Sequence, residues 1–117
     1  MTPAGRRTKG SRVERMLVEA HIANRIPAKR VPLSGAQPGW EGDILIADRL
    51  RAEVKARRAG QGFKVILRWL GDNDLLFLRQ DRTPPLVVMD WDLYLRMMEA
   101  WLGERGELCS PEPASES

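Results

Sequence analysis

The chain has 117 residues, 43% of them apolar and 30% charged, which fits one globular domain and excludes a second. A single cysteine, Cys109, and a single histidine, His21, exclude an intrachain disulfide and the usual Cys/His zinc cluster. No apolar run approaches the about 20 residues that span a bilayer, and none follows the basic N-terminus as in a secretory signal. We therefore expect an intracellular, cytoplasmic protein.

The net charge of +3 is unevenly distributed along the chain. Residues 1–30 hold eight basic and two acidic residues, whereas residues 71–117 hold four basic and ten acidic residues. A basic stretch attracts polyanions, and phosphate contacts release counterions, so nucleic acid is the candidate partner. Charge alone leaves a merely solvated basic face as the alternative.

The N-terminal segment predicts a flexible basic arm over residues 1–9, followed by a helix that begins at Ser11. Ser11 and Glu14 have the spacing of a capping box, and Pro27 ends the helix. Apolar residues at helical spacing predict a buried stripe, which consists of Val13, Met16, Leu17 and Ala20.

Three short strands are predicted next. Residues 28–33 alternate, with Pro27 just before them and Pro32 among them, which favours an edge strand, and a Gly- and Pro-rich loop covers residues 34–42. Residues 43–56 predict two strands joined by a tight turn near Asp48 and Arg49. The last strand should turn one face to the core, namely Leu50, Ala52, Val54 and Ala56.

The pairing of these two strands follows from their hydrophobic pattern. Residues opposite each other in a sheet project to the same side, so Ile44 should pair with Ala52 and Ile46 with Leu50. This register places Asp43 opposite Glu53, and Lys55 shares their face. The predicted register therefore brings two carboxylates and a lysine together on one face of the hairpin.

The rest of the chain predicts a helix over residues 63–70 that ends at Gly71, strands over 75–79 and 86–89, and a last helix capped by Asp90. That helix should bury Trp91, Tyr94, Leu95, Met98, Trp101 and Leu102. The order is α, three strands, α, two strands, α, which is an α/β class.

We expect one domain over residues 10–103 and a disordered tail over residues 104–117, where Glu, Ser, Pro and Gly dominate.

Two acids and a lysine on one face of a hairpin indicate chemistry, because crowded carboxylates are unfavourable unless a cation joins them. Mg²⁺ takes oxygen ligands and keeps waters, so Asp43 and Glu53 with phosphate oxygens form a plausible site. Lys55 would stabilise a hydroxide nucleophile or the charge of a phosphorane. The alternative is that Glu53 and Lys55 are ion partners on a solvated sheet face.

Several motifs together resemble the PD-(D/E)XK nuclease superfamily. They are Lys9-Gly10-Ser11-Arg12-Val13-Glu14-Arg15, Ser34-Gly35, Gly42-Asp43-Ile44 and Glu53-Val54-Lys55. The pattern is similar to archaeal-type Holliday junction resolvases over about residues 9–90, with Gly42 in place of the motif's leading proline. Residues 63–85 look more like small phage nucleases of the same superfamily, which puts four-way-junction specificity in doubt.

The resemblance implies a restriction-endonuclease-like core of the order α-βββ-α-β, with a mixed central sheet flanked by helices. It also implies that Asp43 and Glu53 bind Mg²⁺, for which Mn²⁺ substitutes, and that Glu14 completes the acidic site. Lys55 would act on the attacking water, and Ser34 would contact substrate near the scissile phosphate. Glu14 also has the capping role as an alternative.

Basic residues in the first half of the chain are the candidates for DNA binding: Arg6, Arg7, Lys9, Arg12, Lys29, Arg30, Arg57 and Arg58. Trp40, in the loop before Asp43, would cover the site or wedge against DNA. We expect His21 to be a partly exposed structural residue and the other tryptophans to pack in the core.

The sequence thus predicts a Mg²⁺-dependent endonuclease that cuts branched or structured DNA, in recombination or repair, as a homodimer. The alternatives are a non-catalytic nucleic-acid-binding module on an inactive nuclease scaffold and a protein-interaction domain with incidental charges.

Overall fold

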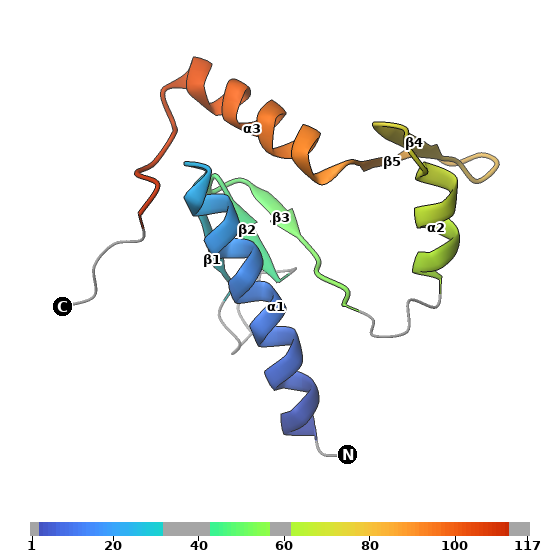
Figure 1. Ribbon diagram of the computed structural model, residues 1–117, viewed down its shortest axis with the longest axis horizontal. Coiled ribbons are helices and arrows are strands. Elements are labelled where there is room, and N and C mark those ends of the chain that lie inside the picture. Colours follow the sequence, from blue (N-terminus) through green and yellow to red (C-terminus); the bar gives the residue numbers. More distant parts are fainter. Residues whose placement is uncertain (1–2, 32–42, 57–61, 113–117) are drawn as a thin grey trace. The chain divides into compact units, whose positions relative to one another are not determined.

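The protein is a small α/β protein with the predicted order of elements, as the computed structural model shows (Figure 1). The structure describes residues 3–31, 43–56 and 62–112. The elements are α1 (Pro3–Ala23), β1 (Ala28–Arg30), β2 (Ile44–Ile46), β3 (Leu50–Ala52), α2 (Phe63–Leu70), β4 (Leu75–Leu78), β5 (Leu86–Met89) and α3 (Trp91–Arg105).

The chain forms two compact units. The first unit comprises residues 1–56 and 98–117, and the second comprises residues 57–97. Helix α3 begins in the second unit, and its part from Met98 onward belongs to the first. The single domain predicted over residues 10–103 stays a prediction.

Helix α1 begins at Pro3, eight residues before the predicted start at Ser11. The predicted flexible arm is therefore wrong from residue 3 onward. Proline is favoured at the first position of a helix, and the alanine, arginines and lysine that follow are good helix formers. Because Ser11 lies inside the helix, it cannot form the predicted capping box with Glu14.

The end of α1 lies where Pro27 predicts it, and its backbone makes a Schellman motif. Arg25 takes a positive φ of 67°, the Arg25 N–H donates to Ile22 O at 2.9 Å, and the Ile26 N–H donates to His21 O at 2.9 Å. This turn directs the completely buried Ile26 into the core of the first unit.

The first unit contains a three-stranded antiparallel sheet in the order β1-β2-β3. The predicted pairs Ile44 with Ala52 and Ile46 with Leu50 are confirmed, and so is the edge position of β1. Ala47 and Asp48 both have positive φ in the turn, and the Arg49 N–H donates to Ile46 O at 3.1 Å, as in hairpins with type I′ geometry.

The core of the first unit lies between α1, the sheet and the end of α3. Its buried apolar residues are Ile26, Val31, Ile44, Ile46, Ala47, Met98 and Leu102. His21 is also buried, which corrects the prediction of partial exposure, and its Nδ1 lies 2.6 Å from Leu17 O. Burial lowers the pKa of His21, whereas the backbone hydrogen bond raises it less.

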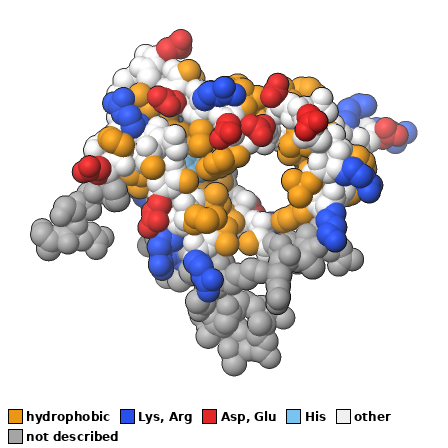
Figure 2. All heavy atoms as spheres, in the orientation of Figure 1, with side chains coloured by type: hydrophobic (Ala, Val, Ile, Leu, Met, Phe, Trp, Pro, Cys, Tyr) orange, Lys and Arg blue, Asp and Glu red, His pale blue; other side chains and the backbone are white. Residues whose placement is uncertain are grey.

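Some residues predicted to be buried are exposed instead. Met16, Leu50, Trp69, Trp91 and Trp101 belong to this group. Leu50 directly follows the turn at the tip of the hairpin, where a side chain has few neighbours. Hydrophobic side chains, orange in Figure 2, accordingly reach the surface of the protein.

The second unit contains α2, the antiparallel pair β4-β5 and the start of α3. Helix α2 ends at Gly71, as predicted, and packs against β4. Asp90 caps α3 as predicted, since its Oδ2 accepts from the Leu93 N–H at 3.4 Å. Every strand pair in the described ranges is antiparallel, which differs from the predicted mixed sheet.

The end of α3 differs from the predicted disordered tail over residues 104–109, whereas residues 113–117 of that tail lie outside the described part of the chain. Gly106 has a φ of 69°, its N–H donates to Gly103 O at 3.2 Å, and the Glu107 N–H donates to Leu102 O at 2.9 Å, which is a second Schellman motif. The Cys109 N–H then donates to Arg25 O at 2.9 Å. These backbone bonds fix residues 106–109 within the first unit, and composition alone does not reveal them.

Candidate functional site

The candidate site lies where β2 and β3 end. Beyond the pair Ile44–Ala52 the ladder becomes irregular: the Asp43 N–H donates to Ala52 O at 2.8 Å, and Asp43 Oδ2 accepts from the Val54 N–H at 2.6 Å. Asp43 O also accepts from the Val31 N–H at 3.0 Å. The half-buried Asp43 is thus fixed by three backbone groups from both neighbouring chain segments.

Glu53 lies beside Asp43, as the register predicts. The pKa of Glu53 is raised, chiefly by the hydrogen bond and the charge of the Asp43 carboxylate, and Lys55 partly opposes this rise. Two neighbouring carboxylates repel each other, and a cation bound between them would relieve that repulsion.

Lys55 shares the exposed face with Glu53. Its Nζ lies 3.9 Å from Glu53 Oε2, and both side chains are more than half exposed. A contact of this length in water contributes little to stability, so the ion pair does not by itself explain the arrangement. The structure thus brings Glu53 close to both Asp43 and Lys55, and the role of these residues as a site stays a prediction.

Glu14 approaches this group from α1. Its side chain is only 15% exposed, and its Oε1 accepts from Arg30 Nε at 3.3 Å. Arg30 pairs with Ile44 in the sheet, one residue from Asp43, and the charge of Glu14 contributes to the raised pKa of Glu53. The three predicted acids are therefore electrostatically coupled, although Glu14 is held by an arginine.

The donor set around Asp43 fits a metal that keeps part of its water shell. Within residues 3–31, 43–56 and 62–112 there is no group of three or more His, Cys, Asp or Glu side chains arranged to hold an ion. The adjacent carboxylates of Asp43 and Glu53 do fit Mg²⁺, which is commonly held by one or two carboxylates together with waters and substrate phosphates. Their mutual crowding, seen in the raised pKa of Glu53, is what a cation would relieve.

The remaining predicted residues fall into three groups. Ser34, Trp40, Arg57 and Arg58 lie outside the described residues. Arg6, Arg7 and Lys9 lie on α1, in the part of the helix whose side chains are also outside the description. Arg12 is exposed, and Lys29 contacts Asp48 at 3.5 Å.

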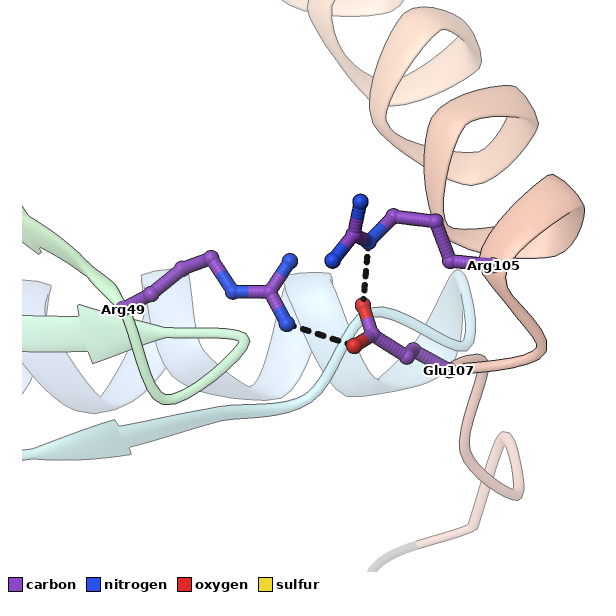
Figure 3. A network of polar contacts seen from close by, with 3 residues as sticks. All are labelled: Arg49, Arg105 and Glu107. Carbon is purple, nitrogen blue, oxygen red and sulfur yellow. Dashed lines mark hydrogen bonds and ion pairs between the residues drawn. The ribbon is translucent and has the colours of Figure 1, made fainter.

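The sequence did not predict two contacts of the first unit. Arg30 was expected to bind DNA, yet it holds Glu14. At the far end of the hairpin, Arg49 and Arg105 both contact the Glu107 carboxylate (Figure 3). Their guanidinium groups also lie 5.5 and 5.4 Å from the Trp101 ring centre. Strand alternation places Arg30 on the side of the helix, but no local pattern indicates the second contact.

Comparison with known proteins gives no relative: no family model, no curated protein and no solved structure matches the chain. In the ranges that the structure describes, the helices are too short or too polar to cross a membrane.

Proposed function

We propose that the protein is a metal-dependent endonuclease that cleaves phosphodiester bonds in branched or structured DNA, with a site of the PD-(D/E)XK type. The observation that carries the proposal is the pair of neighbouring carboxylates, Asp43 and Glu53, with Lys55 at 3.9 Å from the second. The α-βββ-α order of elements is consistent with a restriction-endonuclease-like core.

The chain's own residues would each have a distinct role. Asp43, whose backbone and side chain are fixed by both neighbouring segments, provides a preorganised oxygen ligand. Glu53 provides the second ligand, and Lys55 holds the attacking water or the developing negative charge next to it. Glu14 adds negative potential from the helix, and its contact with Arg30 keeps it in place.

Mg²⁺ at such a site supplies polarisation of a phosphoryl oxygen and a water molecule of lowered pKa. Mn²⁺ would substitute because it accepts the same oxygen ligands. Basic residues of α1 and Lys29 of β1 would hold the DNA through its phosphates, and a homodimer would present two sites for two strands.

The test is cleavage of labelled linear, flap and four-way-junction DNA by the purified chain, with Mg²⁺ and with EDTA. Cleavage of a branched substrate that disappears in EDTA is the expected result. The matched control is Asp72→Asn, which removes an exposed aspartate of the second unit and should cleave like the natural chain. Absence of Mg²⁺-dependent cleavage on every substrate would contradict the proposal.

A second candidate function is a nucleic-acid-binding module without catalysis. It is favoured by the ion pair that occupies Glu14, and by the absence of a three-ligand group among the residues described. In that case the chain would bind DNA equally well with Mg²⁺ and with EDTA and would cut none.

A further inference from the structure

The three-stranded sheet of the first unit has two different faces. Ile44 and Ile46 are buried in the core, and Arg30, which pairs with Ile44, contacts Glu14 of α1. Residues opposite each other in a sheet project to the same side, so this side is turned toward α1. Successive side chains of a strand point to opposite faces, so the residues between them are turned away from the helix. We call that second side the outer face.

A row of three residues crosses the outer face. Lys29 pairs with Leu45, and Leu45 pairs with Arg51, so each strand of the sheet contributes one residue. Neighbouring strands lie about 4.8 Å apart, which places the Cα atoms of Lys29 and Arg51 about 10 Å apart. The row thus holds a cation on each side of a leucine, and backbone pairing within the first unit fixes this spacing.

The row lies next to the candidate site. Asp43 precedes Leu45 by two residues, and Glu53 follows Arg51 by two residues, so strand alternation brings both carboxyl groups to the outer face. The effect of Asp43 on the pKa of Glu53 agrees with this placement. Residues two apart on a strand are separated by about 7 Å, so a DNA strand whose phosphate enters the site is within reach of the row.

The charges around the row are compatible with phosphate binding. Lys29 lies 3.5 Å from Asp48, whose side chain is 81% exposed, and an exposed ion pair of this kind contributes little to stability. Lys29 can therefore exchange Asp48 for a phosphate at small cost. A divalent cation held by Asp43 and Glu53 would neutralise the two carboxylates nearest to Arg51 and would leave the outer face positive.

We infer that the row of Lys29, Leu45 and Arg51 binds the DNA strand next to the bond that is cut, with both cations on its phosphates. Arg51 is not among the residues that the sequence predicts to bind DNA, and its guanidinium presents the planar fork of donors that matches a phosphate. Charge favours DNA over a second copy of the chain, because a twofold contact would bring each cation near its own equivalent. The inference rests on the metal-holding pair of the proposed function and adds a binding residue to it.

The test is the affinity of the full chain for a labelled four-way junction in Ca²⁺, which takes oxygen ligands as Mg²⁺ does. Fluorescence anisotropy measures the affinity, and a gel checks that the DNA stays intact. Arg51→Gln should weaken binding about tenfold, as for the loss of one charged hydrogen bond, and should reduce the slope of log affinity against log salt by about 0.9. Arg51→Lys keeps the charge and should recover most of the affinity.

The matched control is Arg79→Gln, which removes the same charge from an exposed arginine of the second unit and should leave the affinity unchanged. Circular dichroism of each variant checks that the fold is retained. Unchanged affinity of Arg51→Gln overturns the inference, and so does an equal loss in Arg79→Gln.

The same variants separate this inference from the nuclease proposal. A chain that binds the junction through Arg51 but cuts no DNA in Mg²⁺ supports the row and contradicts only the nuclease proposal. A chain that cuts DNA in Mg²⁺ and binds it equally well with Arg51→Gln overturns only the row.

Discussion

At the scale of single residues, the Asp43 carboxylate has two roles, one in the hydrogen bonding of the sheet and one in the electrostatics of the candidate site. Its side chain replaces a backbone acceptor where the β2–β3 ladder becomes irregular, and the same carboxylate raises the pKa of Glu53. A residue that serves both purposes can be probed by a substitution that keeps the hydrogen bond and removes the charge.

Asp43→Asn should therefore keep the fold and abolish cleavage. The asparagine Oδ1 can still accept from the Val54 N–H, but the neutral amide is a poor ligand for Mg²⁺. Glu53→Gln should likewise keep the fold and abolish cleavage, because its neutral amide is an equally poor ligand for Mg²⁺. Single-turnover cleavage measures the loss of activity, and thermal unfolding checks that the fold is retained. Full activity of either variant rejects the site.

His21 gives a second prediction at this scale, on stability against pH. Burial lowers its pKa in the folded protein below the ordinary value of 6.5, so the neutral ring is favoured by folding. The contribution of His21 to the stability of the fold is complete above 6.5, the ordinary pKa that it has in the unfolded chain. It is lost as the pH falls from 6.5 toward the lower pKa of His21 in the folded protein. Urea unfolding at pH 8 and pH 5.5 should show this loss, and His21→Gln should reduce it. An equal pH dependence in His21→Gln would assign the effect to other groups.

At the scale of elements, the sequence predicts the hairpin well and the helix ends poorly. The alternation of residues 43–54 leaves one register that buries Ile44 and Ile46, so a strict pattern determined both the pairing and the approach of Asp43 to Glu53. Helix α1 starts early because helix propensity continues through its basic residues, which carry no hydrophobic period. Likewise, Leu50 and Trp101 match an apolar stripe, but burial depends on neighbours from distant segments.

Two glycines at the end of α3 test the C-terminal turn, because replacing each by alanine should change the free energy of unfolding in opposite directions. Gly106 has a positive φ, and a Cβ added there would meet no atom within 4 Å, so Gly106→Ala should lose about 1 kcal/mol through backbone conformation alone. Gly103 is helical, and a Cβ there would meet Leu108 Cδ1 at an ordinary 3.5 Å. Gly103→Ala should therefore gain about 1 kcal/mol. Denaturant unfolding measures both, and a stabilising Gly106→Ala would refute the turn.

At the scale of the whole molecule, the uneven charge makes the N-terminal part of the chain the proposed contact for DNA. Residues 1–30 carry most of the excess positive charge, and the acids of the candidate site come from the same part of the chain and from residues 43–53. Phosphate contacts position a protein without reading sequence, so their loss should weaken binding to every DNA substrate alike. A uniform loss of DNA binding would therefore distinguish substitutions of the basic residues from substitutions of the proposed catalytic residues, which should affect cleavage.

The final prediction replaces Arg6, Arg7 and Lys9 by glutamine, which keeps helix propensity on α1 while removing three charges. Each lost phosphate contact should reduce the slope of log affinity against log salt by about 0.9 on duplex DNA, or up to about 2.7 in total. The control replaces Arg79, Arg82 and Arg96 by glutamine, which changes the net charge equally in the second unit. Binding titrations by fluorescence anisotropy at several salt concentrations measure both slopes. An equal decrease in the control would mean that net charge, and not α1, governs the affinity, whereas a decrease confined to the α1 variant places the DNA backbone along this helix.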